Sequence, residues 1–183
     1  MWHDVPCPAS LLCVAVRSCA AHTAGLQPHT GIVLTGPFDA LAHPDANPAT
    51  AFLHQRYFFD PPEAQTVAVF PDEPGRHWCL YRDTADGETF VVEARGGDDG
   101  RKFGIVDDTL AGALMKRAEE CSGNKARTGG AQVLQQLRSM SAPSTRRWKQ
   151  RLKRVVGHTF CGIGIVVPVV DDVGYRPLHH PMR

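Results

Sequence analysis

The sequence predicts an α+β fold with a mainly antiparallel sheet and flanking helices. Three observations lead to this prediction. Short β-type segments follow one another between residues 56 and 95, and Pro or Gly residues separate them. Apolar residues then recur at helical spacing over residues 110–118. A β-branched run at residues 163–170, near the end of the chain, needs other strands to pair with.

The first expected element is a strand in GIVLTGP, residues 31–37, which Gly36 and Pro37 end. FDALAH, directly after it, is typical of a short helical turn. Four β-type segments follow, and the turn residues between them favour an antiparallel meander. These segments are RYFFD (56–60), QTVAVF (65–70), RHWCLYRD (76–83) and ETFVVEAR (88–95).

Helices are expected in the second half of the chain. A brief FGIV strand precedes the first helix, which Asp107 or Asp108 can cap. A second helix is expected at 131–140 and a third over the basic segment that follows Pro143. The strand at 163–170 then returns to the earlier sheet. The apolar face of the first helix consists of Leu110, Ala111, Leu114, Met115 and Ala118.

The net charge of +1 is the sum of unlike parts. Residues 1–120 carry 17 acidic and 9 basic side chains, whereas residues 121–170 carry 9 basic side chains and no acidic one. Within the basic part, RRWKQRLKR (146–154) has cations at six of nine positions, and Trp148 and Leu152 share one helical face.

This basic pattern is open to two interpretations. It suits binding to nucleic-acid phosphate or to an acidic protein surface, or a nuclear import signal. It also suits a solvated helix in a linker. The candidate contact residues are Arg146, Arg147, Lys149 and Arg151.

No motif in the chain assembles an active site. CGIGIVVP contains Gly-x-Gly, but β-branched residues follow it instead of a phosphate-binding helix. Six cysteines form no Cys-x-x-Cys pair, which favours reduced thiols over a zinc site or a disulfide framework. His77, Trp78 and Tyr81 lie inside a strand pattern, where packing is the expected role. We therefore expect no catalytic residue, no bound metal and no membrane span.

Three collinear stretches carry a family resemblance. They are GIVLTGPFDALA (31–42), RYFFDPPEAQTV (56–67) with LYRD (80–83) after it, and TFCGIGIVVPVVDDVGYRPL (159–178). Together they resemble the histone PARylation factor family, the accessory proteins of DNA-damage-activated poly(ADP-ribose) polymerases. The resemblance covers about residues 26–178, is weak between 107 and 157, and is absent over the first 25 residues.

The resemblance also implies a division of the chain. An unmatched segment (1–25) precedes an α+β domain (26–120) and a basic helical segment (121–158). A returning strand with a Tyr-Arg docking motif (159–178) and a short tail (179–183) follow. The helical domain that comes next in family members is largely absent.

In that family the Tyr-Arg pair docks on the polymerase catalytic domain, so the resemblance assigns Tyr175 and Arg176 to partner binding. Family members lend a glutamate from the following helical domain, and this base directs ADP-ribosylation to serine, notably on histones. No residue here matches that glutamate, and the NAD is used by the polymerase. The resemblance thus implies a nuclear, non-enzymatic accessory factor without a cofactor. The alternative is a non-catalytic nuclear module that binds chromatin, DNA or poly(ADP-ribose) through the basic segment.

Overall fold

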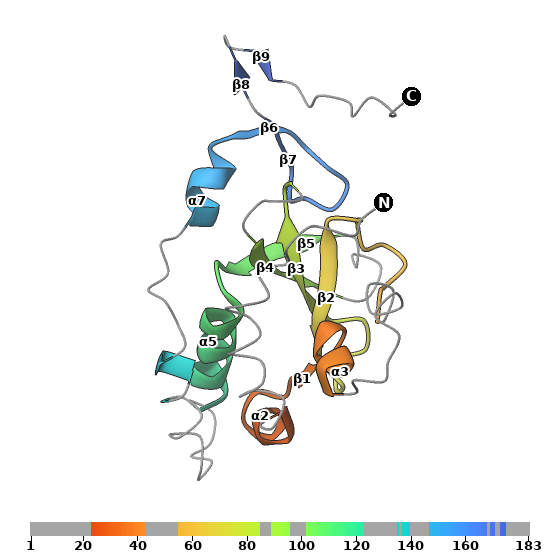
Figure 1. Cartoon of the computed structure of the whole chain (residues 1–183), viewed down its shortest axis with the longest axis vertical. Helices are drawn as coiled ribbons and strands as arrows, with labels where there is room; N and C mark the ends of the chain where they lie inside the picture. Colours follow the sequence, from red (N-terminus) through yellow and green to blue (C-terminus); the bar gives the residue numbers. More distant parts are fainter. Residues whose placement is uncertain are drawn as a thin grey trace.

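A five-stranded antiparallel sheet with the strand order β1-β2-β3-β4-β5 forms the centre of the fold (Figure 1). The strands are β1 (Val33–Leu34), β2 (Ala64–Val69), β3 (His77–Arg82), β4 (Thr89–Ala94) and β5 (Phe103–Asp107). The computed structural model describes residues 23–42, 55–84, 89–95, 102–122, 135, 137–139, 147–167, 169–170 and 173–174. The sheet and its helices confirm the predicted α+β class.

The central strands form the predicted meander. Strand β3 pairs with β4 in an unbroken register from His77 opposite Ala94 to Arg82 opposite Thr89. The turn from β2 to β3 is closed by a hydrogen bond from the Phe70 amide to the Arg76 carbonyl, at 3.2 Å. The proline and glycine residues of 71–75 therefore marked this turn correctly.

One face of the sheet packs against helices. Trp78, Leu80 and Val91 point to this side and form a core cluster with Phe38 and Leu114. Phe38 belongs to α3 (Pro37–Ala42), and Leu114 belongs to α5 (Leu110–Ser122), whose apolar face was predicted. Residues 135 and 137–139, within the expected second helix, are also helical.

The opposite face is covered by the chain that follows the basic segment. Cys79, Tyr81 and Val92 form a second core cluster with Cys161 and Ile163. The prediction that residues 163–170 join the main sheet is therefore wrong. Strand β7 (Ile165–Val166) pairs instead with β6 (Val155–Gly157) in a separate hairpin.

Two glycines explain this departure. Gly162 and Gly164 have φ values of +81° and +79°, a left-handed conformation that bends the chain before a long strand forms. A further hairpin joins β8 (Val169–Val170) to β9 (Val173–Gly174). Figure 1 shows these hairpins and α7 (Arg147–Leu152) at the opposite end of the molecule from α2 (Thr23–Thr30).

Helix α2 was not predicted from the sequence; Pro28 lies inside it. Its last residue, Thr30, is buried and accepts a hydrogen bond from Arg117 of α5 at 3.1 Å. None of the described helices is long and apolar enough to cross a bilayer.

Candidate functional site

The basic segment is anchored to the body of the protein at the start of α7. The Asp108 carboxylate accepts hydrogen bonds from the backbone amides of Arg147 and Trp148, at 3.0 and 3.1 Å. Asp108 thus caps α7, not the helix that follows it in sequence, and satisfies amides that a helix start leaves unpaired. Helix α5 is capped by Thr109, whose hydroxyl accepts from the Gly112 amide at 3.0 Å.

Arg151 lies inside the protein. Its Nε and Nη2 atoms donate to the two carboxylate oxygens of Asp83, each at 2.7 Å. Its other donors reach the carbonyls of Ile163 at 2.8 Å and Gly164 at 3.1 Å. The Arg151 side chain is only 8% exposed and four of its five N–H groups already have acceptors, so little of the guanidinium is left for a phosphate. We therefore remove Arg151 from the nucleic-acid contacts proposed from the sequence.

The remaining cations of this segment face solvent to different degrees. Lys149 is exposed and Arg147 is half-buried, while Arg146 lies outside the described residues. Lys153 and Arg154, just after α7, are exposed as well. The predicted apolar face is wrong in part, because Leu152 is 47% exposed and Arg151 is the buried residue of the helix.

A cleft of about 380 Å³ opens beside α7. Its lining includes the cations Arg147, Arg151 and Arg154, the aromatic residues Phe90 and Trp148, and the acidic residues Asp83 and Asp108. The Lys149 ammonium lies 5.4 Å from the centre of the Trp148 ring. The cleft therefore combines cationic, acidic and aromatic side chains beside α7.

The second motif, RYFFDPP, forms a turn and not the predicted strand. The Asp60 amide donates to the Tyr57 carbonyl at 3.1 Å, and the Tyr57 amide donates to the Asp60 carboxylate at 3.1 Å. Arg56 donates to the carbonyls of Asp60 and Pro61, at 3.0 and 2.8 Å. These local bonds compete with strand pairing. They hold Phe58 at the surface, with 93% of it exposed.

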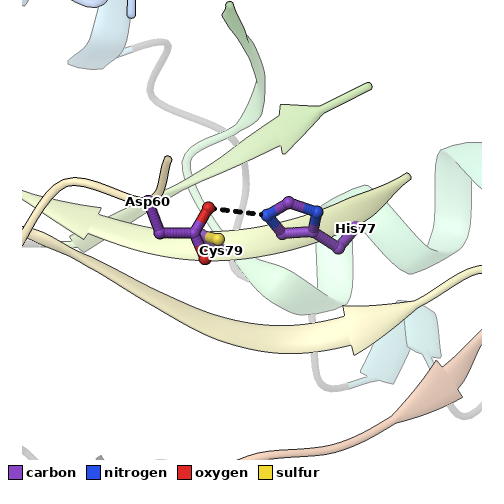
Figure 2. A group of neighbouring side chains, drawn as sticks. All are labelled: Asp60, His77 and Cys79. Carbon is purple, nitrogen blue, oxygen red and sulfur yellow. Dashed lines mark hydrogen bonds and ion pairs between the residues drawn. The ribbon is translucent and has the colours of Figure 1, made fainter. Parts of the chain in front are cut away.

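Asp60 is also the centre of a buried polar group, the Asp60 hub, which joins the turn to the sheet. His77 Nε2 lies 2.9 Å from Asp60 Oδ1, and the Thr66 hydroxyl donates to Oδ2 at 3.1 Å. Figure 2 shows the His77 ring directed at the Asp60 carboxylate, with the Cys79 sulfur close by. Tyr57 stacks on the His77 ring, with 3.9 Å between ring centres.

The Asp60 hub brings together three residue types that bind metals. The ligating atoms of Asp60, His77 and Cys79 lie within 4.8 Å of one another. Both Asp60 oxygens, however, already hold hydrogen-bond partners, and His77 Nδ1 lies 2.9 Å from the Gly75 carbonyl oxygen. Burial raises the pKa of the Cys79 thiol far above its usual range, whereas a metal ligand must be a thiolate. The arrangement therefore favours a structural role.

A second carboxylate, that of Glu93 on β4, lies opposite Trp78 of β3 and is 11% exposed. Glu93 accepts hydrogen bonds from Arg76 at 2.8 Å, Trp78 at 2.9 Å and Arg95 at 2.9 Å. Burial alone would raise the pKa of the Glu93 carboxyl, but these three donors lower it below its ordinary value. Glu93 is thus held as a carboxylate.

Tyr175 and Arg176, here called the docking pair, lie outside the described residues. The last described residue before them is Gly174, at the end of β9.

Sequence reasoning missed two residues that organise contacts between distant segments, Asp60 and Asp83. Asp83 belongs to the LYRD motif, but no local pattern indicates that its partner is 68 residues away.

The chain matches the family model described as Histone PARylation factor 1 over residues 13–182. The match begins earlier than the boundary at residue 26 that the sequence motifs indicate. Similar proteins are named Histone PARylation factor 1 in Danio rerio, with 32% identity over 171 residues, and in Bos taurus, with 33% over 173 residues. A Homo sapiens protein named Putative histone PARylation factor 1-like is 31% identical over 174 residues.

These alignments cover 81%, 84% and 84% of this chain, but 47%, 49% and 49% of the respective relatives. The chain thus spans about half the length of the curated relatives it matches. A family match over residues 13–182 includes all three motifs and both core clusters. The chain belongs to the histone PARylation factor 1 family.

Proposed function

We propose that the chain is a non-enzymatic accessory factor that docks on the catalytic domain of a poly(ADP-ribose) polymerase. The observation that carries this proposal is the extent of the family match, which reaches residue 182 and so includes the docking pair. The relatives are named as factors and not as enzymes, which supports an accessory role. Nuclear localisation and a histone substrate for the joint reaction follow from the same proposal.

The docking pair has the chemistry of an interface hot spot. Tyrosine and arginine are enriched among the residues that contribute most to binding, because they combine a large contact area with directed polar groups. The Arg176 guanidinium can make two parallel hydrogen bonds to one carboxylate. We therefore expect the partner to offer an acidic residue beside an apolar pocket.

The chain's contribution to chemistry is limited by the base it can offer. A serine hydroxyl is a poor nucleophile at neutral pH until a base takes its proton, whereas an acceptor carboxylate is already ionised. The described glutamates all belong to other parts of the fold. Glu63 directly precedes β2, Glu73 pairs with Arg76, Glu93 accepts from three donors, and Glu119 and Glu120 lie on α5. We propose that the 183-residue chain supplies docking and not the base that selects serine.

A reconstitution tests both parts of this proposal. The chain is titrated against the polymerase catalytic domain, and then incubated with DNA-activated polymerase, NAD and a histone tail peptide, whose modified residues are mapped by mass spectrometry. We expect binding that Tyr175→Ala and Arg176→Ala weaken, and modification that stays on acidic residues. Binding that neither variant changes contradicts the docking role, and serine modification contradicts the missing base.

A second candidate function is favoured by the outer surface of α7. Lys149, Lys153 and Arg154 are exposed, and no ion pair is found for them among the described residues. Cations of this kind bind nucleic-acid phosphate with strong salt dependence. If this surface binds DNA, Lys149→Glu with Arg154→Glu should abolish the affinity and flatten its salt dependence. Unchanged DNA affinity in the double variant removes this candidate.

A further inference from the structure

We infer that Arg151 is a positioning residue for docking, because its contacts with Asp83 and with the Ile163 and Gly164 carbonyls fix the segment that leads to the docking pair. This inference rests on the proposed function. The group formed by Arg151, Asp83 and these two carbonyls is called the latch below. Arg151 lies within the basic segment, where the sequence suggested a surface for anions instead.

The latch joins two parts of the chain that are distant in sequence. Asp83 directly follows β3, the central strand of the sheet, and receives two hydrogen bonds from the Arg151 guanidinium at 2.7 Å. The remaining donors of the same guanidinium reach Ile163 and Gly164, immediately before β7. One side chain therefore ties the end of the sheet to the start of the terminal hairpins.

The surroundings make this arrangement rigid. The Arg151 guanidinium carbon lies 5.1 Å from the centre of the Phe90 ring and 5.6 Å from that of Tyr81, so aromatic rings restrict its position. A planar guanidinium offers donors in a fixed fork, which matches a carboxylate on one side and two carbonyls on the other. Removal of the fork would take two hydrogen bonds from the Asp83 carboxylate and one from each of the Ile163 and Gly164 carbonyls.

The latch acts where the chain changes direction. Gly164 has a φ of +79°, and a Cβ atom there would collide with the Val155 side chain of β6. The Gly164 amide donates to the Thr159 hydroxyl at 3.0 Å, while its carbonyl accepts from Arg151. Both backbone polar groups of Gly164 therefore have hydrogen-bond partners. These bonds set the direction in which β7 runs away from the five-stranded sheet.

Only residues 165–174 separate Gly164 from the docking pair. The described part of this stretch includes the two-residue strands β7, β8 and β9, and Tyr175 follows Gly174 directly in the sequence. A preorganised segment binds more tightly than a mobile one, because less conformational freedom is lost on binding. If loss of the latch leaves the segment in its binding arrangement for about a tenth of the time, the dissociation constant rises about tenfold.

The test compares four chains: wild type, Arg151→Lys, Asp83→Asn and the control Val67→Ala. Arg151→Lys keeps the charge but removes the fork, and Asp83→Asn keeps the shape but removes the acceptor's charge. Val67 is fully buried in the core cluster on the opposite face of the sheet, so Val67→Ala lowers stability without touching the latch. Each chain is measured for thermal stability, for affinity to the polymerase catalytic domain, and for hydrogen exchange.

We expect both latch variants to bind the catalytic domain about tenfold more weakly, while Val67→Ala binds like wild type at a temperature where all are folded. Amide exchange in the latch variants should accelerate over residues 155–167 and stay unchanged in β2. Latch variants that bind within twofold of wild type overturn the positioning role, as does an equal loss in Val67→Ala. If the wild-type chain does not bind the domain at all, the proposed function fails. Unchanged amide exchange over residues 155–167 in the latch variants refutes the latch, whatever the binding result.

Discussion

Removal of the Asp60 carboxylate should destabilise the whole sheet, although Asp60 lies in a turn. The Asp60 side chain is 2% exposed and the His77 side chain 3%. Asp60→Ala would leave His77 Nε2, the Thr66 hydroxyl and the Tyr57 amide without their common acceptor. The turn that presents Phe58 would lose its closure at the same time.

The expected loss can be estimated from these contacts. A buried donor that loses its acceptor typically costs roughly 1–3 kcal/mol. Asp60→Ala leaves three donors without this acceptor, but partial access of water offsets part of the sum. We therefore expect the free energy of unfolding to fall by about 4 kcal/mol, which corresponds to a melting temperature lower by roughly 10 °C.

Chemical and thermal denaturation of Asp60→Ala measure this loss, with Asp72→Ala as the matched control. Asp72 is an exposed aspartate in the turn between β2 and β3, so its substitution should change stability by less than about 0.5 kcal/mol. A double-mutant cycle with His77→Ala should give non-additive losses, because the second substitution removes a group already orphaned. An Asp60→Ala chain that melts within about 1 °C of wild type refutes the reasoning.

Three further predictions concern single side chains. Glu93 is held below its ordinary pKa by hydrogen bonds that outweigh the effect of burial, so its stabilising contribution is present above about pH 4.5 and is lost as the pH falls through the lowered value. The melting-temperature gap between wild type and Glu93→Gln should therefore be largest above pH 5 and should shrink toward pH 3; a constant gap would contradict this. Burial, with Glu63 and Asp83 next in importance, raises the pKa of Tyr81 to about 12. The stability that Tyr81 contributes relative to Tyr81→Phe is complete below about pH 10 and should decline as the pH rises toward 12, as denaturation at several alkaline pH values would detect. Gly36 has a φ of +67°, and a Cβ atom added there would collide with the Thr66 carbonyl oxygen. Gly36→Ala should therefore lower the free energy of unfolding by at least about 1–2 kcal/mol. The control Gly104→Ala should cost far less, because nothing lies within 4 Å of a Cβ atom added at Gly104. Equal stability of the two glycine variants would show that the turn adapts.

The sheet was predictable because its signals are local. Segments 65–70, 76–83 and 88–95 combine β-branched and aromatic residues with proline or glycine at each turn. The RYFFD segment has the same composition but forms a turn, because Arg56 and Asp60 bond to the backbone around them. Composition alone does not reveal in which aromatic segment side chains bond to the local backbone.

The latch was not predictable for a different reason. Arg151 is one of six cations within nine residues, and no feature of that segment distinguishes it from Lys149. What distinguishes it is its contact with Asp83, a residue 68 positions earlier in the sequence that the fold brings close. Burial of one arginine in a basic helix thus depends on tertiary contacts alone.

The path of the terminal segment has a similar cause. A β-branched run favours a strand, but it does not specify the partner strand. Gly162 and Gly164 adopt positive φ, and residues 161 and 163 then cover the second face of the sheet instead of extending it. The docking pair was assigned by resemblance to the family, and its role stays a prediction.

The most direct test of docking on the polymerase is a competition. A full-length family member, such as the Danio rerio relative, is combined with DNA-activated polymerase, NAD and a histone peptide, and the 183-residue chain is added in increasing amounts. We predict that serine modification declines as the chain occupies the docking surface, and that Arg176→Ala does not compete. Serine modification that stays constant with excess wild-type chain, or that rises, would contradict the proposed function.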